Sequence, residues 1–321
     1  MRYGVRIAPA AMAAALLLGG CEHKELCYRH PHGAEDLEVR YEWEKAPEAH
    51  PAVMTLYLYA EGGGDFLRFD FTDRTGGTVR VPSGRYRALS LNGDAQALSL
   101  RGTETHAGFE ITTPEAELLP GLEGLGIQST GAPRAEGTGG ERVAASPDTL
   151  WCDRSLALEV AAGDRNLLTH TPVRKVCYYT VEILGVRNLN YTTGVSATLS
   201  GLAGGYRPGS DAPSAERVTV PFELEAADDG TTLRGRFLTF GDNTSGEDGS
   251  VRHVLTVYAV LTDGSKWYHD YDITEQLHAA ADPWEVLLRV EGLLLPKPIA
   301  NGGGLQPTVD DWQDVAIDIE M

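Results

Sequence analysis

The chain has 321 residues, which suggests about two domains, and 42% of them are hydrophobic, a share typical of globular proteins. With 46 acidic against 27 basic residues, its formal net charge is −19. This balance argues against nucleic-acid binding and against docking on anionic lipid through a polybasic patch, because both need a basic surface.

The first 20 residues have the layout of a secretory signal, with two arginines near the start and an apolar run over 8–18. The run is about half the ~20 residues that a membrane-spanning helix needs. The Leu-Gly-Gly-Cys sequence at 18–21 resembles the bacterial lipobox. The resemblance implies that residues 1–20 are a lipoprotein signal peptide and that Cys21 is acylated. An ordinary signal peptide with an incidental cysteine is the alternative.

Residues 21–35 are polar and rich in histidine, and we interpret them as a lipidated tether that lifts the body off the membrane. The spacing of the histidines and Cys27 does not match the paired spacings of structural zinc motifs. We therefore predict no metal site in this segment.

The first β-sandwich domain is predicted over 36–170. In 37–43, apolar residues alternate with charged ones, which is the pattern of a strand with one buried face. Residues 53–59 are apolar on both faces, which indicates a central strand. Pro82-Ser83-Gly84 lies between two β-rich runs and predicts a hairpin turn. Further strands are expected at 66–71, 78–81, 86–91, 97–100, 108–112 and 156–160.

The pattern of short strands fails over 113–148, where Gly, Pro, Glu and Thr dominate. The glycines within 121–126 do not have the spacing of a dinucleotide-binding loop, and no strand and helix flank them. We expect a long surface loop here.

The second β-sandwich domain is predicted over 171–321, with one helix at 274–281 and strands at 173–184, 195–199, 217–224, 232–240, 251–261 and 284–290. In the last strand, Val315, Ile317, Ile319 and Met321 share one face. We propose this strand as the candidate segment for strand exchange with a partner, with 37–43 as the other candidate. The alternative is that both strands pair within their own domains.

The remaining cysteines are Cys27, Cys152 and Cys177, which allow one disulfide in an oxidising compartment. Cys152 and Cys177 flank the predicted domain junction and are the favoured pair. Three buried, unpaired thiols are the alternative.

Motifs of nucleophilic hydrolases, zinc proteases and P-loop proteins are absent from the sequence, so we predict no catalytic residue, no metal, no cofactor and no enzyme. Residues 241–248 contain oxygen ligands but depart from the EF-hand order, which favours a hairpin loop over a calcium site. Trp43 and Trp284 are expected in the core. Trp267, with the aromatic residues that follow it, could form a glycan-binding surface or pack against the sheet.

Short motifs recur along the chain at 21–28 with 31–32, 81–86, 199–202, 239–241, 263–264, 271–274 with Gln276, and 311–315. Together these segments resemble Bacteroidota lipoproteins related to the fimbrillin-associated anchor proteins of FimB type. The resemblance implies two tandem transthyretin-like (Greek-key) β-sandwiches and a lipid anchor on the outer membrane, with surface exposure. It also implies a role as a fimbrial anchor or accessory subunit that contacts fimbrillin-type subunits. A glycan- or ligand-binding lipoprotein of a nutrient-uptake system is the alternative.

Overall fold

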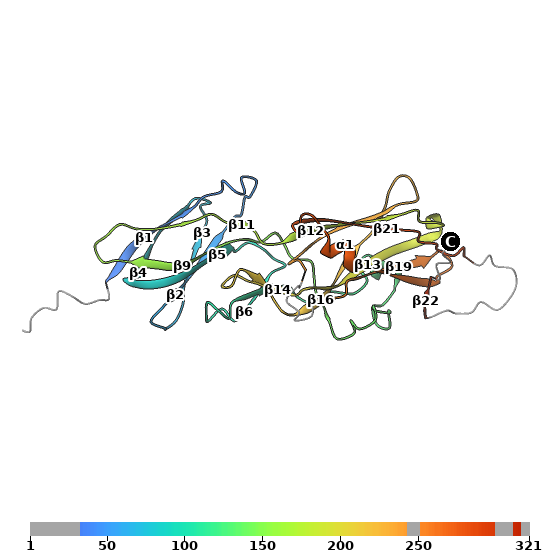
Figure 1. The fold of residues 1–321 in the computed structure, drawn as a ribbon, viewed down its shortest axis with the longest axis horizontal. Coiled ribbons are helices and arrows are strands. Elements are labelled where there is room, and N and C mark those ends of the chain that lie inside the picture. The colour runs from blue at the N-terminus through green and yellow to red at the C-terminus, as the bar shows by residue number, and fades with distance from the viewer. Residues whose placement is uncertain (1–32, 243–250, 299–310, 316–321) are drawn as a thin grey trace, which may run out of the picture.

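The protein is described here from a computed structural model, which places residues 33–242, 251–298 and 311–315. These residues form two lobes arranged end to end in an elongated molecule (Figure 1). Five β-sheets account for almost all regular structure. The predicted all-β fold built from two sandwiches is confirmed. Within the described residues, the search for a helix long and apolar enough to cross a membrane finds none.

The first lobe consists of two facing sheets, one with the strand order β10-β1-β4 and one with the order β11-β9-β5-β2-β3. A cluster of buried apolar side chains, including Leu37, Leu56 and Val81, fills the space between them. The strands are β1 (Ala34–Tyr41), β2 (Met54–Ala60), β3 (Leu67–Phe71), β4 (Gly76–Pro82), β5 (Gly84–Asn92), β9 (Trp151–Val160), β10 (Asn166–His170) and β11 (Val173–Arg174).

Strand β1 follows the alternation predicted from the sequence. Leu37, Val39 and Tyr41 point into the core, and the residues between them face outward. The strand is paired on both sides, in parallel with β10 and antiparallel with β4. As the middle strand of its sheet, β1 has no free edge to offer a partner. For residues 37–41, which lie in β1, the alternative is therefore correct: they pair inside their own domain.

The predicted hairpin at Pro82-Ser83-Gly84 is wrong. Strand β4 pairs with β1 in one sheet, whereas β5 pairs with β2 and β9 in the other. The turn thus carries the chain from one layer of the sandwich to the other. The hydroxyl of Tyr86 donates a hydrogen bond to the carbonyl of Pro82 over 2.8 Å, which closes this corner.

The second lobe is also a sandwich, with the strand orders β17-β18-β12-β21 and β22-β20-β19-β13-β16-β8. Its core includes Tyr179, Leu199 and Leu255. The elements are β8 (Arg142–Val143), β12 (Cys177–Leu184), η3 (Leu189–Tyr191), β13 (Thr192–Ala203), β16 (Arg217–Glu223), β17 (Glu225–Ala226), β18 (Leu233–Thr239), β19 (Val254–Leu261), β20 (Lys266–Asp272), α1 (Thr274–His278), β21 (Glu285–Glu291) and β22 (Trp312–Asp314).

A small sheet joins the two lobes. It consists of β6 (Ser99–Arg101), β7 (Glu110–Thr112), β14 (Gly205–Arg207) and β15 (Ala212–Pro213), with β7 paired to β14. The strand expected at 108–112 therefore pairs with a strand of the second half of the chain, and the strand expected at 97–100 pairs with it on its other side. Side chains of both halves, among them Tyr57, Phe109 and Tyr206, form one buried cluster at this joint. The boundary between the two domains, predicted at residue 171, stays a prediction, because strands before it pair with strands after it.

The segment 113–148 is not the plain surface loop that the sequence suggested. Its short strand β8 extends the six-stranded sheet by pairing in parallel with β16. Next to the one-turn helix η2 (Glu123–Leu125), the buried Leu119 and Leu122 pack against Tyr258 and Val260. The segment thus covers the outer face of the second sandwich, although it precedes that sandwich in the chain.

Candidate functional site

A cavity of about 570 Å³ lies in the second lobe beside the joint. It is bounded by helix α1, by strands β12 and β21, and by the β14–β15 hairpin. Most of its wall is apolar and includes Cys177, Phe240 and Val286. Its charged groups form two sets, a salt bridge between Lys175 and Asp211 and the side chains of Asp242 and His278.

The salt bridge joins Lys175 to Asp211, with 2.6 Å between Nζ and Oδ1. The hydroxyl of Tyr206 also donates a hydrogen bond to this carboxylate. Burial raises the pKa of Tyr206 far above its usual range, so the phenol stays neutral and remains a donor. The carboxylate of Asp211, although its side chain is 40% exposed, thus has two partners within the protein.

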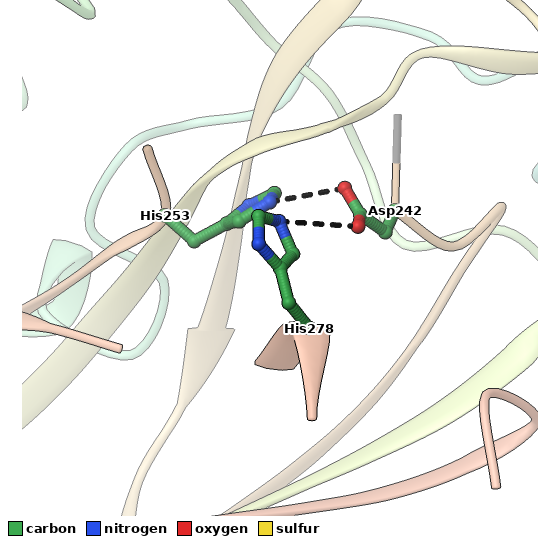
Figure 2. Close-up of side chains that lie close together, drawn as sticks. All are labelled: Asp242, His253 and His278. Carbon is green, nitrogen blue, oxygen red and sulfur yellow. Dashed lines mark ion pairs between the residues drawn. The ribbon is translucent and has the colours of Figure 1, made fainter. Parts of the chain in front are cut away.

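The second polar group is the cluster of Asp242, His253 and His278 (Figure 2). Nε2 of His253 lies 3.0 Å from Oδ1 of Asp242, and Nε2 of His278 lies 3.4 Å from Oδ2. The two imidazole rings are 5.2 Å apart and perpendicular. The three ligand atoms all lie within 4.8 Å of one another. Such a set of groups can bind a positive charge, either a proton or a metal ion.

Three separate elements bring these side chains together. Asp242 follows β18, and a bridge between Asp242 and Leu202 fixes its backbone next to β13. His253 immediately precedes β19 and is completely buried. His278 is the last residue of α1, whose Leu277 is anchored in the core.

Sequence reasoning missed this cluster. Asp242 belongs to 241–248, the stretch singled out for its oxygen ligands, but nothing in the sequence connects it to two histidines on other elements. The short helix that positions His278 was predicted, although α1 ends at His278 rather than at residue 281.

The favoured disulfide is absent. Cys152 and Cys177 are both free and buried, so for these two residues the alternative of unpaired thiols is correct. Cys152 is part of the apolar joint, and Cys177 belongs to the core of the second sandwich. Cys21 and Cys27 lie outside the described residues.

Of the proposed strand-exchange residues, only Val315 is described, and Ile317, Ile319 and Met321 lie outside the described residues. Val315 is buried in the core of the second lobe. Its backbone N–H donates to the carbonyl of Tyr268 over 2.9 Å. The residues just before it form β22, which pairs in parallel with β20 at the edge of the six-stranded sheet.

The aromatic residues on β20 serve packing. Trp267 and Tyr271 pack against the core of the second lobe, and Tyr268 packs against the cluster that includes Leu122. Trp43 is buried as expected, but Trp284 is 43% exposed beside the cavity, so its placement in the core was wrong. Its alternating neighbours do form an edge strand, β21, and Trp284 lies just outside it.

Comparison with known proteins places the chain in a family. The family described as a domain of unknown function, DUF5119, matches residues 20–223, which is more than half of the chain. The chain belongs to the DUF5119 family. This DUF5119 protein is 20% identical over 341 residues to a Bacteroides ovatus protein named "Putative fimbrium anchoring subunit Fim4B". The match covers 97% of this chain and 96% of the relative.

Two solved structures share the fold of this DUF5119 protein. A crystal structure of a "putative adhesin" from Bacteroides ovatus has a TM-score of 0.62 at 18% identity, covering 89% of this chain and 100% of that one. The fimbrial anchor protein Mfa2 from Porphyromonas gingivalis has a TM-score of 0.50 at 14% identity, covering 80% of this chain and 90% of that one. The family relationship expected from the sequence is thereby confirmed.

Proposed function

We propose that this DUF5119 protein is an outer-membrane lipoprotein that acts as a fimbrial anchor or accessory subunit. In this proposal acylated Cys21 holds it on the membrane, and β-strand pairing joins it to fimbrillin-type subunits. The observation that carries the proposal is the end-to-end match with a relative named as a fimbrium anchoring subunit. The shared fold with an adhesin and with the anchor Mfa2 supports it. The role is structural and needs no catalytic residue.

The arrangement of the lobes suits a tethered body. Strand β1 begins at Ala34, at the end of the first lobe that faces away from the second lobe (Figure 1). The 12 residues between Cys21 and Ala34 could span at most about 40 Å. An acyl anchor on Cys21 would therefore hold the first lobe near the membrane and leave the second lobe free to meet a partner.

The candidate surface for strand pairing lies on that second lobe. Among the described residues, β22 pairs with Lys266, Trp267 and Tyr268 of β20, at the edge of the six-stranded sheet. An edge strand is paired on one side only, so the strand of a partner can compete with it for the neighbouring strand. An incoming strand could pair with the freed edge of β20 while its alternate side chains occupy the place of Val315.

Replacing the lipid attachment residue tests the anchor. Cys21→Ala should move the protein, with any fimbria it holds, from the membrane fraction to the medium or the soluble fraction. Cys27→Ala is the matched control, since it removes a nearby cysteine and should leave the protein on the membrane. Membrane attachment of Cys21→Ala at the level of the unmodified protein would contradict the proposal.

Crosslinking on intact cells, followed by pull-down and identification of the partners, tests the fimbrial role. Recovery of fimbrillin-type subunits supports it, whereas recovery of glycan-uptake components favours the alternative. A chain that ends at Val315 tests the strand-exchange segment, since it removes Ile317, Ile319 and Met321. Unchanged recovery of fimbrillins with this chain would show that the segment does not donate a strand.

A further inference from the structure

The strongest unexplained feature is the way His253 is held. Its Nδ1 lies 3.2 Å from the carbonyl oxygen of Ser200. A carbonyl can only accept a hydrogen bond, so Nδ1 must carry the proton and donate it. In the neutral imidazole, Nε2 is then left with a lone pair.

That lone pair faces another acceptor. Nε2 of His253 lies 3.0 Å from Oδ1 of Asp242. Both atoms are buried, and neither takes part in a hydrogen bond with any described residue. Two acceptors at this distance repel each other unless a positive charge lies between or upon them. Because His253 is completely buried, the surrounding fold fixes the orientation of its side chain.

The position of His278 indicates that this positive charge is a metal ion. It brings a second imidazole nitrogen to the other oxygen of the same carboxylate, at 3.4 Å (Figure 2). Tetrahedral Zn²⁺ with bonds of roughly 2.0–2.1 Å places its ligand atoms about 3.3 Å apart. The two imidazole nitrogens lie close to that distance from the carboxylate, at 3.0 Å from Oδ1 and 3.4 Å from Oδ2, and the three ligand atoms lie within 4.8 Å of one another. The backbone carbonyl that orients His253 is also the outer-shell partner that metal-binding histidines commonly have.

We propose that Asp242, His253 and His278 bind a divalent transition metal ion of the zinc type, with one coordination position open to the cavity. Two imidazoles and a carboxylate suit Zn²⁺ and its neighbours, whereas Ca²⁺ and Mg²⁺ prefer oxygen ligands alone. Asp242 and His278 line the cavity, so the open position can take water or an oxygen ligand that enters it. The ion would tie α1 to the chain around β18 and β19.

Zinc titration of the full chain, produced without a polyhistidine tag and stripped with a chelator, tests the site. We expect one Zn²⁺ per chain, a higher midpoint of thermal unfolding with Zn²⁺, and no such rise with Ca²⁺. His278→Ala should weaken binding by more than the roughly 10–100-fold that loss of an outer-shell partner costs. Because His278 is an exposed residue at the end of a helix, the variant should fold, and circular dichroism checks this. His50→Ala, at an exposed position, is the matched control and should bind as the unmodified chain does.

The histidines of the N-terminal tether could bind zinc adventitiously, so a second variant separates the two sources. The double variant His30→Ala/His32→Ala should keep the tight site. Zinc binding that survives in His278→Ala and disappears in this double variant would overturn the proposal. Absence of zinc-dependent stabilisation in the unmodified chain would overturn it as well.

Discussion

Arg142 donates a hydrogen bond from Nε to Oε1 of Glu216 over 2.9 Å, although the two residues are 74 positions apart. The same guanidinium donates to Thr112 on β7, and Arg101 donates to the other oxygen of the carboxylate. The hydrogen bond from Arg142 is the largest cause that lowers the pKa of Glu216. This network holds the small connecting sheet to the segment that covers the second lobe.

Arg142→Ala should destabilise the protein by about 1.5–3 kcal/mol, because hydrogen bonds to charged groups contribute on that order. Urea denaturation measures the change. Arg85→Ala is the control, since Arg85 forms a 3.6 Å ion pair with Glu61 and its side chain is 68% exposed. That exposed pair should contribute at most about 1 kcal/mol. Equal effects of the two variants would contradict the structural role of Arg142.

The packing of segment 113–148 can be tested by comparing two leucines of the segment, one buried and one exposed. Leu122 is completely buried, whereas Leu125, three residues on, is 45% exposed. Leu122→Ala should cost about 2–5 kcal/mol, the usual effect of emptying a leucine site in a core. Leu125→Ala should cost far less. If both variants unfold at the urea concentration of the unmodified protein, the segment is not part of the folded core.

Local patterns in the sequence predicted the strands well and their partners poorly. The alternation in β1 follows directly from one buried face, and the two apolar faces of β2 follow from burial by the first core on one side and by the joint on the other. The turn after Pro82 looked like a hairpin because turn residues do not specify whether the next strand joins the same sheet. Leu119 and Leu122 were missed because no periodic pattern surrounds them.

The histidine cluster could not have been found from spacing. Asp242 was noticed for its oxygen ligands, but His253 and His278 lie on elements whose proximity depends on the pairing of β19 with β13 and on the docking of Leu277. Such a site exists only after the tertiary fold has formed. The N-terminal signal and Cys21, by contrast, are linear features, and for them the sequence alone supports the proposal.

The free cysteines give a chemical test of the corrected disulfide assignment. Burial raises the pKa of both Cys152 and Cys177 to about 12, so neither thiol ionises near neutral pH. Both should resist alkylation in the native protein and react once urea unfolds it. Mass spectrometry of the two peptides measures the labelling without interference from Cys21 and Cys27. A peptide pair linked by a disulfide, or rapid native labelling, would contradict the structure.

His170 should make the stability of the protein depend on pH. Its side chain is buried in the first lobe, where its Nδ1 lies 2.7 Å from the hydroxyl of Ser90. Burial lowers its pKa from 6.5 to about 4. Between these values the unfolded chain binds a proton that the folded chain does not, so stability falls as the pH drops from about 6.5 to about 4. The shift corresponds to a loss on the order of 3 kcal/mol.

His170→Gln should flatten this part of the pH profile, because glutamine does not titrate but keeps a polar group near Ser90. The free energy of unfolding, measured in urea at several pH values between 4 and 7, gives the slope directly. His50→Gln makes the same change at an exposed position and should keep the slope of the unmodified protein. Glu216 also stabilises the folded protein in its ionised form, and this contribution is lost only as the pH falls below its ordinary pKa of about 4.5. That loss therefore lies largely outside the range between pH 4 and 7. An unchanged slope in His170→Gln would show that folding does not shift the pKa of His170.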